Sequence, residues 1–184
     1  MSVITIFSGS FCKEEQVCRE VQARTGQKLF SDRETVAEAS RLSGIAEAKL
    51  ERAFSAKTSV FNQFTHEKER SIAYLRLAVA GLLSGDDLLL SGFAGLLVPK
   101  EISHVLRVCL IADMKFRTSL AMVGHGLPEK EASKVLHKQD EDRAAWVNTT
   151  VQKPDPWDAS LYDILIPMGK TEVAEAATLI IRSA

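Results

Sequence analysis

Residues 3–21, VITIFSGSFCKEEQVCREV, decide the fold of this chain. The stretch begins with a short β-branched run, residues 3–7, which predicts a buried strand. A turn of small residues follows, and a helix is predicted to begin directly after it. This order is typical of the first strand, loop and helix of a nucleotide-binding α/β domain, in which backbone N–H groups at the helix start hold phosphates.

The turn lacks most of the residues that phosphate binding needs. A phosphate loop needs several glycines, so that its backbone can wrap around the anion, and a lysine next to Ser or Thr where the helix starts. Here the turn has one glycine, Gly9, and residues 11–15 read FCKEE. We therefore expect the architecture of a phosphate site without its chemistry.

The composition indicates a globular protein in a reducing compartment. The 184 residues suit one domain, long enough to bury roughly 70% of its unfolded surface. Apolar residues make up 46% and charged residues 26%, and a net charge of −1 favours neither nucleic acid nor an anionic membrane as a partner. Three cysteines without a signal peptide, and without ligand spacing between Cys12 and Cys18, predict a cytoplasmic protein with no metal site.

Apolar segments alternate with turn residues along the rest of the chain. Further strands are predicted at residues 28–31, 88–91, 105–112 and 162–166, with a turn at residues 92–95. Helices are predicted at residues 31–42, 46–54, 72–83, 115–123, 128–148 and 173–181, and residues 55–65 are interpreted as a loop or a mobile flap. This alternation indicates a parallel sheet with right-handed crossovers. We predict one domain over residues 1–184, either free-standing or part of a longer protein.

Short motifs in a fixed order cover nearly the whole chain and carry a resemblance to one family. The motifs are residues 3–6, Gly92, residues 107–112, Arg117, residues 126–132, Asp140 with Arg143, and residues 157–163. In this order and spacing the chain resembles the cytidylate-kinase-like branch of the P-loop nucleoside monophosphate kinases. The resemblance implies a bacterial protein with a three-layer α/β fold, in which helices flank a parallel sheet of about five strands and form a lid.

In this family a phosphoryl group passes from ATP to the phosphate of a pyrimidine monophosphate, while Mg²⁺, backbone amides and cations hold the phosphates in line. The resemblance places these residues at the ligand site: Gly9, Ser10, Lys13, Gly92, Arg117, Asp140 and Arg143. It assigns no catalytic residue and no metal ligand, and it implies Mg-ATP as a cofactor only if the chain is active.

The loop departs from the family pattern at every glycine. The family's Gly-Ser-Gly-Gly and its following basic residue fall on residues 11–15, so the basic position is Glu15, and Gln16 cannot serve as a Mg²⁺-binding hydroxyl. Side chains there are expected to keep the backbone from turning its N–H groups inward. Glu14 and Glu15 suit the positive end of the helix dipole, and they would repel a triphosphate by about 1–4 kcal/mol per close charge pair.

The acceptor side departs from the pattern as well. The family's Gly-Arg-Gly after the middle strand falls on residues 92–94, GFA, and a phenylalanine offers a phosphate neither charge nor donor. Phe93 is interpreted as filling the cleft rather than stacking on a base. Arg117 and Arg143 remain, either as phosphate ligands or as ion-pair partners of the acidic residues 140–142.

Two residues of the loop each allow two interpretations. Lys13, two positions before the family's basic residue, is either a substitute phosphate ligand or a solvated side chain at a helix start. Cys12 is either a thiol of lowered pKa that senses oxidants or an inert packed side chain. For both residues we favour the second interpretation.

Three functional hypotheses follow. The first is a kinase-like domain that has lost phosphoryl transfer and works as a ligand-sensing or partner-binding regulatory module, with a nucleotide or another phosphorylated metabolite as its ligand. The second is an active CMP or dCMP kinase that uses Mg-ATP with Lys13 and the lid arginines. The third is a structural domain that forms a homodimer through its long central helix.

Overall fold

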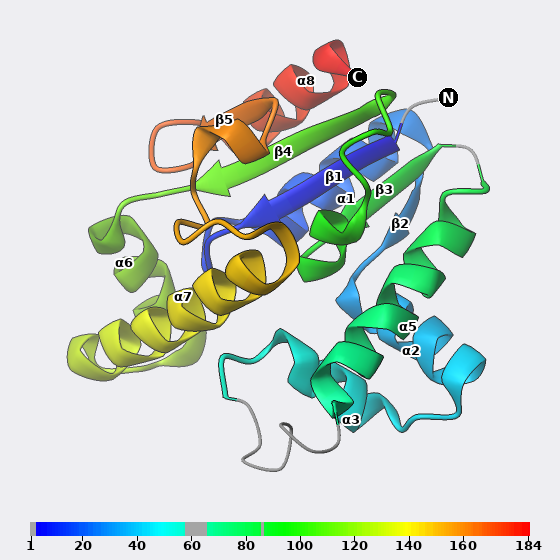
Figure 1. Ribbon diagram of the computed structural model, residues 1–184. Coiled ribbons are helices and arrows are strands. Elements are labelled where there is room, and N and C mark those ends of the chain that lie inside the picture. The colour runs from blue at the N-terminus through cyan, green and yellow to red at the C-terminus, as the bar shows by residue number, and fades with distance from the viewer. Residues whose placement is uncertain (1–2, 58–65, 86) are drawn as a thin grey trace.

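The computed structural model describes residues 3–57, 66–85 and 87–184, and its centre is a parallel sheet of five strands (Figure 1). β1 lies in the middle of the sheet, and its Ile4 pairs with Leu89 on one side and with Leu106 on the other. The α/β fold expected from the sequence is confirmed. In spatial order the strands are β2 (Lys28–Phe30), β3 (Leu88–Ser91), β1 (Val3–Ser8), β4 (Val105–Ile111) and β5 (Ile164–Pro167).

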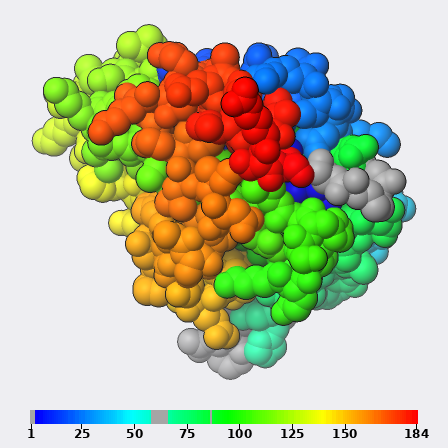
Figure 2. Space-filling view, turned by 90° about the horizontal axis from the view of Figure 1, so that it is seen from above, coloured from blue at the N-terminus to red at the C-terminus, as the bar shows by residue number. Residues whose placement is uncertain are grey.

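Helices cover both faces of the sheet, which explains why β1 is buried along its whole length. Side chains alternate along β3, so that Leu88 and Leu90 belong to one apolar cluster and Leu89 to the other. Seen from above, the red residues of the C-terminal helix lie beside the blue N-terminal part of the chain (Figure 2). The first face carries α2 (Asp32–Ser43), α3 (Glu47–Glu51) and α5 (Glu67–Leu82), and the second carries α1 (Glu14–Thr25) and α8 (Val173–Ser183).

Two further helices, α6 (Met114–His125) and α7 (Glu129–Val151), pack against each other beyond the carboxyl end of β4 (Figure 1). Asp113 begins α6, because its side chain accepts a hydrogen bond from the backbone N–H of Phe116 at 2.8 Å. These helices are the lid that the family resemblance implies. The predicted capping box of Ser31 and Glu34 is present at the start of α2.

Local boundaries differ from the predictions. Residues 46–54 form α3 followed by a 3-10 helix, η1 (Arg52–Phe54), and the turn predicted after β3 is another 3-10 helix, η2 (Phe93–Leu97). A third, η3 (Ala159–Leu161), precedes β5, and Tyr162 stays outside the strand with its hydroxyl donating to the Pro156 carbonyl at 2.6 Å. Of the predicted flap, residues 58–65 lie outside the described residues.

No helix within the described ranges has the length and apolar character needed to cross a membrane.

Candidate functional site

The candidate site lies at the carboxyl ends of the central strands, where residues 9–13 lead from β1 into α1. A cleft of about 680 Å³ is lined by this turn, by the first turn of α1, and by Ser31, Glu34 and Ser91. Open parallel sheets bind ligands outside the carboxyl ends of their strands, where neighbouring connections leave in opposite directions. The neighbours of β1 are β3 and β4, so the cleft occupies the position that this fold class uses.

The backbone of the turn is left-handed at two residues that carry side chains. The φ angles are 60° at Phe11 and 58° at Lys13, a region that costs residues other than glycine roughly 1–2 kcal/mol. The turn adopts these angles although both residues carry side chains. Hydrogen bonds anchor the turn at both ends, from Gly9 N–H to Leu110 O at 2.9 Å and from Val17 N–H to Lys13 O at 3.0 Å.

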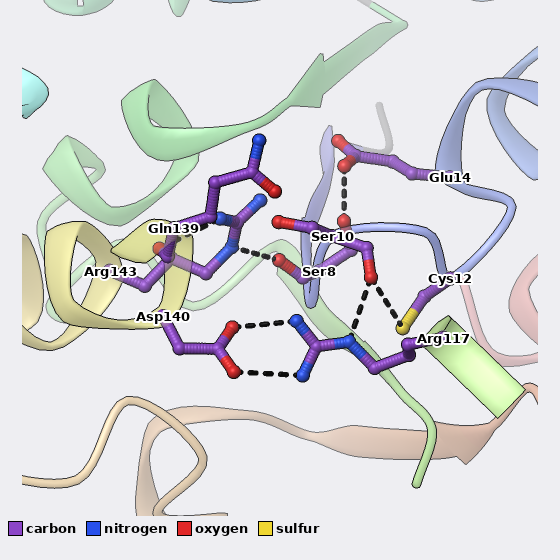
Figure 3. Close-up of polar contacts among 8 residues, drawn as sticks. All are labelled: Ser8, Ser10, Cys12, Glu14, Arg117, Gln139, Asp140 and Arg143. Carbon is purple, nitrogen blue, oxygen red and sulfur yellow. Dashed lines mark hydrogen bonds and ion pairs between the residues drawn. The ribbon is translucent and has the colours of Figure 1, made fainter. Parts of the chain in front are cut away.

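Glu14, the first residue of α1, turns its carboxylate toward the carboxyl ends of the central strands (Figure 3). The carboxylate accepts hydrogen bonds from the Ser91 hydroxyl, at 2.6 Å, and from the Ser8 hydroxyl. It therefore bridges β1 and β3 at the positive end of the α1 dipole, where an anionic ligand would otherwise be favoured. Glu15 instead pairs with Arg19 on the exposed side of the helix.

Lys13 does not reach toward Glu14. Its Nζ atom lies over the ring of Phe116 in α6, 5.6 Å from the ring centre, which is the geometry of a cation–π contact. The positive charge of the turn is therefore directed at the lid.

Arg117 of α6 ties the lid to the turn. The residue is buried, and its Nε donates to the Ser10 carbonyl at 2.8 Å. Its two terminal nitrogens donate to both carboxylate oxygens of Asp140 in α7, at 2.9 and 2.7 Å. All three guanidinium nitrogens are thus engaged within the chain, in a forked geometry that a lysine could not reproduce (Figure 3).

Arg143 of α7 binds the other end of the turn. Its Nε donates to the Ser8 carbonyl at 2.6 Å and one terminal nitrogen donates to the Gln139 carbonyl at 3.0 Å, while the guanidinium lies 5.4 Å from the ring centre of Phe93. Burial lowers the pKa of this guanidinium, although an arginine remains charged in a protein. Its second terminal nitrogen has no hydrogen-bond partner among the described residues.

Two buried oxygens near Arg143 lack partners among the described residues: the Ser10 hydroxyl and the Gln139 side-chain carbonyl. The backbone carbonyl of Gln139 accepts a hydrogen bond from Arg143, and Ser10 lies two residues after Ser8, whose carbonyl Arg143 also contacts (Figure 3). An unpartnered buried oxygen costs roughly 1–3 kcal/mol, so these two groups mark a place that a bound polar group or water would satisfy.

The acceptor side is filled by aromatic rings. Phe93 stacks on Phe54 with 5.2 Å between ring centres, and it meets Phe7 and Trp146 edge to face at 5.9 and 6.1 Å. The Trp146 indole N–H donates to the Phe93 carbonyl at 2.9 Å. These contacts support the interpretation that Phe93 packs rather than binds a base.

Asp32 is a site residue that sequence reasoning missed. It is the first residue of α2, and its carboxylate accepts the backbone N–H groups of Phe93 at 3.0 Å and of Ala94 at 2.8 Å. Burial raises the pKa of Asp32 to about 7, with Glu14 acting in the same direction. Gly92 makes room for it, because a Cβ there would come within 2.6 Å of the Asp32 Cγ. The signal in the sequence is an acidic residue in the first turn of a helix that closely follows a strand.

Cys12 packs as an inert thiol. It is 1% exposed, and burial raises its pKa to about 11, which opposes the thiolate that oxidant sensing needs. Cys18 and Cys109 are buried as well. Within the described ranges, no three His, Cys, Asp or Glu side chains are grouped so that they could hold a metal ion.

The structure thus gathers the predicted residues around one turn. Ser10, Arg117 and Asp140 form one hydrogen-bonded group, Arg143 contacts the turn at Ser8, and Lys13 points away. Gly92 lies at the carboxyl end of β3, where its missing side chain leaves room for the Asp32 carboxylate.

Solved structures share this fold over nearly their whole length. An uncharacterized protein from Eubacterium ventriosum has a TM-score of 0.73 at 19% identity, covering 99% of this chain and 97% of that one. A gluconokinase from Sinorhizobium meliloti has a TM-score of 0.53 at 14% identity, covering 100% and 93%. A shikimate kinase from Acinetobacter baumannii, in complex with shikimate, has a TM-score of 0.51 at 12% identity, covering 100% and 92%. At these identities the likeness concerns the fold alone.

Sequence comparison is more specific. A search of curated proteins gave no match. Residues 3–170 match the model of one family, which is most of the chain. The protein therefore belongs to the cytidylate kinase-like family.

Proposed function

We propose that this chain has lost phosphoryl transfer and acts as a ligand-sensing or partner-binding regulatory module. The observation that carries the proposal is the position of Glu14, whose carboxylate lies at the start of α1 and is held there by the hydroxyls of Ser8 and Ser91. A triphosphate seated on the same helix start would meet this fixed negative charge at close range. The repulsion amounts to about 1–4 kcal/mol per close pair of charges.

The cations of the site offset little of that repulsion. Phosphoryl transfer depends on positive groups that neutralise the phosphates and hold them in line. All three side-chain nitrogens of Arg117 already donate hydrogen bonds to Ser10 and Asp140, and the Lys13 ammonium lies over the ring of Phe116. Releasing Arg117 would leave the Asp140 carboxylate without its partner, which makes the exchange unfavourable.

Binding capacity remains beside Arg143. One nitrogen of its guanidinium, the Ser10 hydroxyl and the Gln139 side-chain carbonyl have no partner among the described residues. A polar ligand group that both accepts and donates hydrogen bonds would satisfy them. Of these groups, the guanidinium nitrogen and the Ser10 hydroxyl can donate to a phosphate, which supports a nucleotide or another phosphorylated metabolite as the ligand, held without transfer.

The proposal is tested on the wild-type protein with Mg-ATP and CMP. We expect no formation of CDP and ADP above the buffer control, measured by chromatography of the nucleotides. Calorimetry with CMP alone and with Mg-ATP alone then distinguishes a ligand-binding module, which responds to the monophosphate, from a structural domain that responds to neither. Turnover of the two substrates would establish the active kinase and overturn the proposal.

Replacing Glu14 by glutamine is expected to raise the affinity for Mg-ATP about tenfold or more, because it removes a like charge and keeps the shape of the side chain. The matched control is Glu15→Gln, which removes the exposed neighbouring carboxylate that pairs with Arg19. We expect this control to change the affinity less than about threefold, because exposed charges are screened. Equal changes in Mg-ATP affinity in the two variants would show that the Glu14 carboxylate does not exclude phosphates from the start of α1.

A further inference from the structure

A small cavity of about 170 Å³ opens beside the main cleft, on the side of α2 and η2. Two carboxylates, those of Glu14 and Asp32, and the guanidinium of Arg143 contribute to its wall. The hydroxyl-bearing residues Ser8, Ser31 and Ser91 also line it. Because so few charged groups line this cavity, the gain or loss of one proton changes its net charge from negative to neutral or back.

We propose that Asp32 is a proton-operated clamp, which holds the start of η2 when it is ionised and loosens it when it is protonated. Each carboxylate oxygen accepts one backbone N–H, from Phe93 at 3.0 Å and from Ala94 at 2.8 Å. These N–H groups begin a 3-10 helix and have no partner within it. A proton taken up from solvent occupies one oxygen, so one of the two N–H groups loses a strong acceptor.

The charges that face Asp32 come from two other helices. Glu14 of α1 favours the proton and Arg143 of α7 opposes it, as do the two backbone hydrogen bonds. Burial is the largest influence, and the pKa of the carboxyl is about 7 as a result. Counting Glu14, Asp32 and Arg143, the cavity carries one net negative charge above this pH and none below it, so acid also makes the cavity more tolerant of anions.

The clamp has a defined effect on stability. An aspartate in an unfolded chain has a pKa of about 3.9, which is lower than the value of about 7 in the folded protein. Between these two values the folded protein binds more protons than the unfolded chain. The contribution of Asp32 to the free energy of unfolding therefore falls as the pH rises through this window and is constant outside it.

Trp146 reports on the clamp, because its indole N–H donates to the Phe93 carbonyl at the start of η2. The chain has two tryptophans, so Trp157→Phe leaves Trp146 as the only tryptophan, which can be excited selectively. In this background we expect the fluorescence of the folded protein to change with a midpoint near the pKa of Asp32. Asp32→Asn should abolish the change, and Asp113→Asn, which alters another carboxylate at a helix start, should leave it intact.

The outcomes are separable from those of the proposed function, because no ligand takes part. A flat profile in the Trp157→Phe protein, or a transition that survives Asp32→Asn, would overturn the clamp. If Asp32→Asn does not fold, the side-chain carboxyl carbon of Asp32 can be followed by NMR in the wild-type protein, where a midpoint below pH 5 would overturn it. Glu14→Gln should shift the midpoint to lower pH, because it removes the charge that favours the proton.

Discussion

Replacing Arg117 by alanine is expected to lower the free energy of unfolding by about 3 kcal/mol. The guanidinium is nearly enclosed, with 6% of its side chain exposed, and the Asp140 side chain is 23% exposed. The substitution leaves Asp140 partly buried without a counter-charge and leaves the Ser10 carbonyl without its donor. Urea unfolding followed by far-UV circular dichroism measures the loss.

The chain supplies a matched control for this prediction. Arg19 pairs with Glu15 on the surface of α1, where both side chains are more than two-thirds exposed, at 72% and 76%. Arg19→Ala should cost less than about 0.5 kcal/mol, because exposed pairs contribute little. Arg117→Lys should fall between the two alanine variants, because it keeps the charge and loses the fork. Similar losses for Arg117→Ala and Arg19→Ala would contradict a lid that is tied to the turn by Arg117.

Replacing Gly92 by alanine is expected to cost about 3 kcal/mol or more, from two sources. The backbone at Gly92 has φ 98° and ψ −154°, a region that costs other residues about 1–3 kcal/mol. The new Cβ would also press on the Asp32 carboxyl, at 2.6 Å from its Cγ. Thermal and urea unfolding of the variant measure the total.

A substitution at a second glycine measures the cost of backbone strain without a steric clash. Gly126 ends α6 with φ 63°, and a Cβ there meets nothing within 4 Å. Gly126→Ala should therefore show backbone strain alone, about 1 kcal/mol. In the double variant Gly92→Ala with Asp32→Ala, the clash is absent, so the combined loss should be smaller than the sum of the single losses. Additive losses would show that Gly92 and Asp32 do not press on each other.

The fold was predictable because its signals are local. Residues 3–7 and 105–112 are mostly apolar, each interrupted by one polar residue, and the spacing of Val173, Ala176, Ala177 and Ile180 is that of one buried helix face. Patterns of this kind arise within single elements and survive in one sequence. The ends of the elements were less predictable: the start of η2, for example, is held by Asp32, which is 61 positions away from Phe93 in the sequence.

The site was less predictable, because its decisive contacts join residues far apart in the sequence. Glu14 and Ser91 are 77 positions apart, Asp32 and Ala94 are 62 apart, and Arg117 and Asp140 are 23 apart. The sequence named both Arg117 and Arg143 as possible ion-pair partners of residues 140–142, and the structure pairs Asp140 with Arg117. The replaced glycines indicated that the anion site was altered, but only the topology shows which carboxylate occupies it.

Because all three cysteines are buried, the rate at which each one is alkylated reports how often its surroundings open. Burial raises the pKa of Cys18 and of Cys109 to about 12, as it raises that of Cys12 to about 11, so alkylating reagents find neither access nor thiolate in the closed molecule. Each thiol becomes reactive only when its surroundings separate. Cys12 lies in the turn, and Cys109 lies in the inner strand β4. Mass spectrometry of alkylated wild-type protein would therefore compare the rate of local opening of the turn with the rate of opening of the sheet.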